Sequence, residues 1–253
     1  MRTSRIKEDG AGYYHIISRV VDRQMVLTTD EKERFRTTMR AVEAFSGCEV
    51  LTYACLDNHW HIFLYVPERK EVTDEDLIAR LGHLYDRQVV KHLDSYLKEL
   101  WRAGRQATAK QLKAEYTYRM YDLSEFVKTV KQRFTQSFNR RHGRKGTLWE
   151  ERFKSLLVGD SEGAMLAVAA YIDLNAVRAG IVKEPKEYRF CGYGEAMGGS
   201  TQARRGIGLV MKSLASTSSW REAAREYRKL LYIAGGSPWR HGNRAAGKAR
   251  AST

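Results

Sequence analysis

Two histidines in an apolar segment are the first residues of this sequence that could do chemistry. His59 and His61 flank Trp60 in "LDNHWHIFLYVP", residues 56–67. Residues two apart on a strand point to the same face, so both imidazoles could bind one metal ion while Trp60 and Ile62 face a core. Hydrogen-bonded polar side chains are common on sheets, so this pair taken alone favours a structural role.

A tyrosine and an asparagine form the second candidate pair. Tyr171 and Asn175 lie in "AAYIDLNAVRAG", residues 169–180, and are four positions apart. That spacing places a phenol and a carboxamide on one face of a predicted helix that is otherwise apolar. A buried tyrosine bonded to backbone and an asparagine near a helix end would explain both residues, so in isolation the structural role is again favoured.

A basic run with interleaved aromatic residues covers positions 126–154. Basic side chains can bind phosphates, and aromatic rings can stack on unpaired bases. Phe126, Val130, Phe134 and Phe138 keep helical spacing and are expected in the core, so the loop that follows is the better binding candidate. The predicted DNA-contacting residues are Arg19, Arg140, Arg141, Arg144, Lys145, Trp149, Arg152 and Lys154.

The three features combine into one mechanism. A metal held by His59, His61 and the amide oxygen of Asn175 keeps open positions for phosphate oxygens and can act as a Lewis acid. Tyr171, one helical turn away, can attack the same phosphorus and form a phosphotyrosine. An oxygen ligand and labile coordination favour Mg²⁺ or Mn²⁺ over a closed zinc site.

The elements that must position these residues are predicted from hydrophobic periodicity. Strands are expected at 13–21, 48–56, 59–66 and 152–160, and helices at 28–45, 124–142 and 161–180. Their order predicts an α+β fold, a ferredoxin-like antiparallel sheet with helices on one face. A helical insertion is expected over about residues 70–122. We therefore expect one domain over 1–199 and a basic C-terminal extension over 200–253, with a helix at about 218–234 and a mobile tail.

The charge of the chain points to a polyanion partner. The net charge is +14, and eleven Lys and Arg against two Glu after residue 200 account for +9 of it. Such asymmetry suggests nucleic acid. The three cysteines fit a reducing cytoplasm and neither a disulfide framework nor a zinc site. We expect no membrane span and no secretory signal, because no apolar run is long enough.

Four segments of the sequence carry a family resemblance. "NHWHIFL" resembles the HUH motif (His, hydrophobic, His) of the single-tyrosine transposases, the IS200-like family. "YIDLNAVRAGIV" is similar to the Y-I-x-x-N-P-V-R-x-G tyrosine helix of their REP-associated tyrosine transposase branch. "GTLWEERFKS" and "GYYHIISRVVDRQ" resemble the segment before that helix and the family's first strand. The likeness covers roughly residues 11–66 and 122–195.

The resemblance implies a role for each site residue. His59 and His61 would be metal ligands, Asn175 the third ligand and Tyr171 the nucleophile. The family cleaves single-stranded DNA near short hairpins, leaves a 5′-phosphotyrosine and a free 3′-hydroxyl, and rejoins strands by reversing the step. A monomer or a homodimer, associated with a bacterial nucleoid, is implied. Ala176 replaces the motif's Pro, with little expected chemical consequence.

Two other functions compete with this one. A hairpin DNA-binding protein that has lost mobility, such as a domesticated regulator, would bind without cleaving. The retention of all four chemical residues weighs against it. A small RNA-binding module of the RRM type would carry aromatic residues in a K/R-G-F-G-F-V run on a central strand, and this sequence has no such run.

Overall fold

The computed structural model of the protein describes residues 10–211 and 219–235. Within these ranges, strands β1 (Gly12–Arg19), β2 (Glu49–Cys55), β3 (His59–Val66) and β4 (Lys154–Val158) form one antiparallel sheet in the order β2-β3-β1-β4. Helix α1 (Thr29–Ser46) joins β1 to β2, and α5 (Leu123–His142) precedes β4. This order of elements is that of a ferredoxin-like unit, as the sequence predicts.

Side-chain caps and glycines set the ends of the crossover helices. The hydroxyl of Thr28 accepts a hydrogen bond from the Glu31 amide at the start of α1. Asp122 caps α5 by accepting from the Glu125 amide at 2.9 Å. Helix α5 ends at Gly143, whose φ of 60° lies in the left-handed region that favours glycine.

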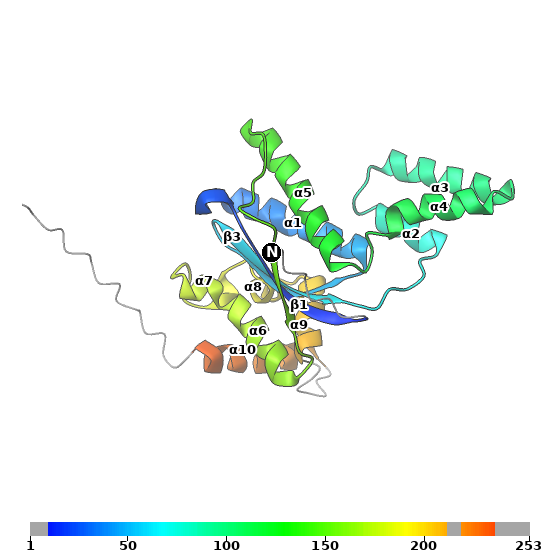
Figure 1. The fold of residues 1–253 in the computed structure, drawn as a ribbon. Coiled ribbons are helices and arrows are strands. Elements are labelled where there is room, and N and C mark those ends of the chain that lie inside the picture. The colour runs from blue at the N-terminus through cyan, green and yellow to red at the C-terminus, as the bar shows by residue number, and fades with distance from the viewer. Residues whose placement is uncertain (1–9, 212–218, 236–253) are drawn as a thin grey trace, which may run out of the picture.

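Helices cover both faces of the sheet (Figure 1). Helices α1 and α5 lie on one face, where Phe35 packs against Trp60 and Phe134 at ring centroid distances of 5.4 and 5.7 Å. The other face carries α6 (Glu162–Asp173), α8 (Gly192–Met197), α9 (Thr201–Met211) and α10 (Trp220–Gly235). This second layer extends the prediction, which placed helices on one face only. It forms because the segments after β4 are amphipathic or apolar and bury their apolar sides on the sheet.

The predicted insertion is helical and extends away from the sheet (Figure 1). It contains α2 (Asp74–Leu81), α3 (Arg87–Arg102) and α4 (Gln106–Thr117). Its helices bury two small apolar clusters, one of which includes Phe45 of α1. Arg69, at the start of the insertion, holds the C-terminal end of the insertion in place. It donates hydrogen bonds to backbone carbonyls there, among them that of Met120 at 2.8 Å.

The C-terminal extension is partly built into the core. The predicted helix is present as α10, in which Tyr227 and Leu231 are buried. Helix α9 runs so close to β2 that Gly206 faces the backbone carbonyls of Val50 and Leu51. Residues 236–253, where we expected a mobile tail, lie outside the described residues. Across residues 10–211 and 219–235, no helix combines the length and the apolar character that crossing a membrane requires.

Candidate active site

The histidine pair lies on the sheet face that α6 covers. In the β1–β3 register, His61 pairs with Ile17 and His59 with Arg19, so the two imidazoles share a face. Trp60 points to the opposite face and is fully buried against Phe35. This arrangement follows from the two-residue period of the strand and agrees with the predicted orientation.

Tyr171 of α6 lies against these histidines. Its ring centroid is 5.8 Å from that of His61 and 5.8 Å from that of His15 on β1. The tyrosine is 44% exposed, whereas His61 and His15 are 4% and 6% exposed. The fold therefore brings together a buried imidazole cluster and a phenol that solvent can reach, from segments more than a hundred residues apart. The predicted juxtaposition of His61 and Tyr171 is present.

Asn175 adjoins Tyr171 through the backbone. We predicted one helix over 161–180, but α6 ends at Asp173 and a short α7 (Asn175–Arg178) follows. The amide nitrogen of Asn175 donates to the carbonyls of Tyr171 and Ile172, at 3.0 and 3.3 Å, and this side-chain competition for backbone acceptors favours a break. The side-chain oxygen of Asn175 is left to act as a ligand. No hydrogen bond in the described part of the chain joins it to the histidines, so its role as third ligand stays a prediction.

His15 is a site residue that the sequence analysis did not single out. Its Nε2 lies 2.9 Å from Nδ1 of His61. Burial lowers the pKa of His15 to about 4 and that of His61 to about 3, and neighbouring His15, His59 and Arg19 add to the effect on His61. Both rings are therefore neutral near pH 7. If His61 donates from Nδ1 to His15, its Nε2 keeps a lone pair for a metal.

Asn58 fixes the tautomer of His59 in the same way, through a hydrogen bond to Nδ1. The amide nitrogen of Asn58 donates to the Arg23 carbonyl at 3.1 Å, which turns its Oδ1 toward Nδ1 of His59, 2.7 Å away. Because that oxygen can only accept, Nδ1 of His59 carries the proton and Nε2 carries a lone pair. Burial also lowers the pKa of His59, with Arg19 as the next cause.

These tautomers fit the predicted metal. Two neutral imidazoles, each held through Nδ1, are typical of ligands oriented by an outer shell of hydrogen bonds. Across the described residues, no three His, Cys, Asp or Glu side chains come close enough together to hold a metal ion. If the site holds a metal, a third protein ligand would be of another type, and the amide oxygen of Asn175 is the one that the sequence predicts.

Arg178 brings a positive charge to the tyrosine. Its guanidinium carbon lies 5.1 Å from the centroid of the Tyr171 ring, and its Nη1 donates to the Tyr171 carbonyl at 3.3 Å. A cation so placed is favourable to negative charge that develops on or near the phenol oxygen. The residue falls inside the quoted tyrosine motif, but its spacing alone gave no role.

A cleft of about 210 Å³ opens beside the histidines, and its lining contains four basic residues and two acidic ones, Glu150 and Glu151. Arg19, which faces His59 across the β1–β3 pair, lines it together with Arg23, Arg152 and Lys154. Arg152 also lines a larger groove of about 630 Å³ between α5 and the loop that follows it. Lys128 and Lys131 of α5 line the same groove. Three of the predicted DNA-contacting residues thus lie at the site. Arg140 is exposed in the last turn of α5 and Lys145 is exposed on the loop, whereas Arg144 is partly buried with its guanidinium over Phe138.

Two of the predicted DNA-contacting residues are already engaged within the protein. Trp149 is only 5% exposed, packs on Trp60 and Phe134, and donates from its indole to Thr135 at 2.9 Å. Its ring is therefore largely covered, although Trp149 also lines the larger groove beside α5, and its contact with DNA stays a prediction. Arg141 pairs with the buried carboxylate of Glu31, while its own side chain stays 25% exposed.

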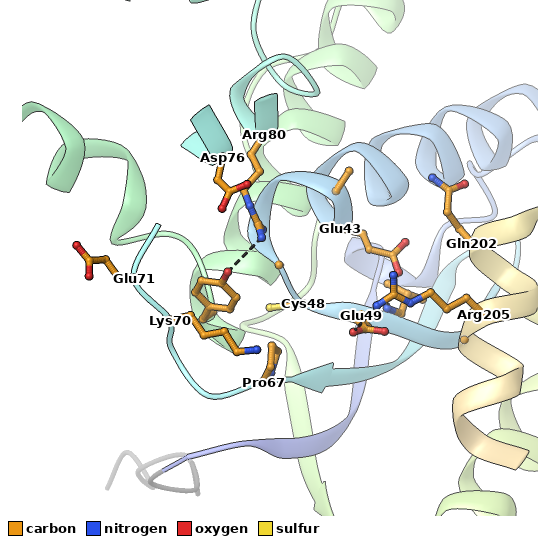
Figure 2. Close-up of a pocket in the computed structure, with 15 residues that line it drawn as sticks. Glu43, Cys48, Glu49, Pro67, Lys70, Glu71, Asp76, Arg80, Gln202 and Arg205 are labelled. Carbon is orange, nitrogen blue, oxygen red and sulfur yellow. Dashed lines mark hydrogen bonds and ion pairs between the residues drawn. The ribbon is translucent and has the colours of Figure 1, made fainter. Parts of the chain in front are cut away.

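A cavity of about 620 Å³ lies at the other end of the sheet (Figure 2). It is lined by Pro67, just beyond the end of β3, whereas His59 stands at the start of that strand, roughly 26 Å away along an extended chain. Two of its charged groups are bonded within the protein: Arg205 pairs with Glu49 at 2.9 Å, and Arg80 donates to the Tyr121 hydroxyl at 3.1 Å. None of the predicted chemical residues lines it.

Comparison with known proteins gives one family match and one similar solved structure. Residues 10–108 match the family model described as "Transposase IS200 like". Among solved structures, the chain is similar to the REP-associated tyrosine transposase bound to a REP hairpin, with a TM-score of 0.50 and 16% identity over 80% of this chain and 90% of that one. No curated protein matches the sequence. At such identity the structural match shows the fold alone, and the family match ends before Tyr171. Together they confirm the resemblance predicted from the motifs: residues 10–108 resemble the IS200-like transposases, and the chain has the fold of the REP-associated tyrosine transposase.

Proposed function

We propose that the protein is a metal-dependent endonuclease and strand-transferase that cuts single-stranded DNA near hairpins, of the kind found in REP sequences or at insertion-sequence ends. The coarser activity, that of a DNA-binding transposase, agrees with the family match and the fold. The observation that carries the finer proposal is the packing of the Tyr171 phenol against His61.

The chemistry assigned to Tyr171 is a transesterification. Its Oη forms a bond to the phosphorus, and the bond from phosphorus to the 3′ oxygen breaks. The tyrosine loses a proton and the leaving oxygen gains one, so the products are a 5′-phosphotyrosine and a free 3′-hydroxyl. A Mg²⁺ or Mn²⁺ ion bound at His59 and His61 would polarise the phosphodiester. Attack by a 3′-hydroxyl on the phosphotyrosine reverses the step and joins strands.

The surrounding residues supply binding and orientation. Arg19, Arg152 and Lys154 line the cleft beside the histidines and can hold the phosphates of a strand that enters it. Arg178 stabilises charge that develops at the phenol. Because Tyr171 is exposed while His15 and His61 are buried, a strand can reach the phenol without opening the sheet.

The test uses the full chain, Mn²⁺ and a pool of labelled single-stranded hairpin DNA with randomised flanks. Wild-type protein should form a covalent adduct that mass spectrometry places on Tyr171. Tyr171→Phe should lose the adduct and the cleavage while binding DNA within about twofold of wild type, because only the nucleophile is removed.

Tyr96→Phe is a matched control, since Tyr96 is 41% exposed on α3 and far from the histidines in sequence. It should cleave like wild type. Cleavage by Tyr171→Phe would refute the assignment of the nucleophile. Hairpin binding without any cleavage by the wild type would favour the alternative, a non-mobile regulator.

A further inference from the structure

A buried carboxylate lies between the two chemical residues of the tyrosine helix. Asp173 is 0% exposed and sits two residues after Tyr171 and two before Asn175. Its Oδ1 accepts from the Thr52 hydroxyl at 2.8 Å and from the Tyr193 amide at 3.0 Å. Its Oδ2 accepts from the Tyr227 hydroxyl at 2.6 Å. The three donors come from β2, α8 and α10, so one side chain joins four elements.

Such an arrangement sets position more strictly than apolar packing does. A buried carboxylate is costly unless each oxygen is bonded, and its neighbours Ile172 and Leu174 show that apolar residues fit the same layer. Apolar surfaces tolerate small slides, whereas three hydrogen bonds from three directions hold at one placement only. The cluster therefore fixes both the rotation and the height of α6 over the sheet.

The placement is fixed relative to the histidines. Thr52 lies on β2 two residues before Ala54, and Ala54 pairs directly with His61 on β3. Helix α8 is seated closely enough for its Tyr193 amide to reach the carboxylate, because Gly192 has no side chain. A Cβ there would lie 2.1 Å from Oγ1 of Thr52.

We infer that Asp173 is a positioning residue that holds Tyr171 against the histidines of its own chain. Asp173 and its three donors form a clamp, which Tyr227 of the C-terminal extension completes. The inference rests on the proposed function, since it gives the clamp its purpose. It also makes the nucleophile act in cis, because α6 is bonded to the β2 and α10 of the same chain. The extension then serves the active site through α10 in addition to any contact with DNA.

The first test compares two tyrosines of one helix. Tyr227→Phe removes only the buried hydroxyl, and Tyr232→Phe removes an exposed one on the same helix. Tyr227→Phe should slow single-turnover cleavage by about tenfold or more, toward the ~100-fold loss that a misplacement of about 1 Å can cause, with DNA affinity within about twofold. Hydrogen exchange across residues 162–174 should rise as well. Tyr232→Phe should match wild type in all three measurements.

A conservative rescue on the other side of the clamp separates positioning from packing. Thr52→Ser keeps the hydroxyl and should retain the rate, whereas Thr52→Val keeps the shape, loses the donor and should slow cleavage with unchanged affinity. Wild-type rates and exchange in both Tyr227→Phe and Thr52→Val would overturn the clamp, as would a parallel loss of binding and of the global fold.

The cis arrangement has a test of its own. Equimolar Tyr171→Phe and His61→Ala proteins should show no cleavage when mixed, because neither chain holds a complete site. Restored cleavage would overturn action in cis. If wild-type protein itself cleaves no hairpin DNA, the proposed function fails, while the exchange comparison still decides whether Asp173 and Tyr227 fix the helix.

Discussion

Two glycines in α9 give the sharpest prediction about how the C-terminal extension is attached. Gly206 and Gly208 share one helix and neither has a positive φ, so alanine is compatible with the backbone at both. A Cβ at Gly206 would lie 2.4 Å from the Val50 carbonyl oxygen and 2.6 Å from that of Leu51, whereas a Cβ at Gly208 would meet nothing within 4 Å. The two substitutions should therefore change stability in opposite directions.

The size of each effect follows from these distances. Ordinary contacts begin at 3.4 Å, so Gly206→Ala must move α9 about 1 Å away from β2. Overpacking of this kind costs about 1–3 kcal/mol, offset by the roughly 0.5–1 kcal/mol that alanine contributes to a helix. The net loss is about 1–2 kcal/mol, or roughly 0.5 M in the urea midpoint for an m value near ~3 kcal/mol/M. Gly208→Ala should raise the free energy of unfolding by about 0.5–1 kcal/mol.

Urea denaturation followed by circular dichroism measures both variants against wild type. An unchanged m value would show that the compactness of the native state is preserved. The reasoning fails if Gly206→Ala is as stable as Gly208→Ala, because α9 would then not be seated on the β2 carbonyls. The same result would remove the support for a rigid second layer beneath the tyrosine helix.

Three further predictions concern the site. His15→Leu, which removes the acceptor for His61, should weaken Mn²⁺ binding by about 10–100-fold in a spin-resonance titration, while His15→Gln, which keeps an acceptor, should lose less; equal affinities would exclude His15 from the outer shell. In metal-free buffer the stability contributed by His15 and His61 is fully present above their unfolded pKa of 6.5 and is lost as the pH falls toward 4 and 3, at up to ~1.4 kcal/mol per pH unit for each histidine. Asp173, whose pKa burial raises to about 6, acts in the opposite sense in wild type and variant alike. Because His15→Gln lacks one of the two histidines, its free energy of unfolding should fall less steeply between pH 6.5 and 5 than that of wild type; parallel slopes would refute this prediction. Arg152→Ala should weaken DNA binding for all sequences and reduce the salt slope by about 1, whereas Lys98→Ala on α3 should leave both unchanged.

The sequence was most informative where a short period decides orientation. The two-residue repeat of a strand places His59 and His61 on one face and Trp60 on the other, and the fold agrees. Hydrophobic spacing also predicted the crossover helices, at 28–45 and 124–142, close to the observed α1 and α5. Apolar spacing also identified α10, although the basic surplus there suggested an electrostatic role first.

Residues that depend on strand register could not be predicted in this way. His15 reaches His61 because β1 and β3 pair in one particular alignment, which no local pattern specifies. Trp149 beside basic residues looks the same in a sequence whether its ring faces solvent or Trp60. Asp173 did carry a readable signal, since an acidic residue in an apolar helix needs partners, but those partners lie on three distant elements.

Asp173 and Tyr171 together resolve a conflict that any exposed nucleophile faces. The phenol must be open to a DNA strand, and open side chains are usually poorly fixed. Two residues along a helix are about 200° apart around its axis, so one can meet solvent while the other is buried. Tyr171 is 44% exposed and Asp173 is 0% exposed, on one turn of α6. Accessibility and placement are thus assigned to different residues, and losing the buried one should slow cleavage without closing the site to DNA.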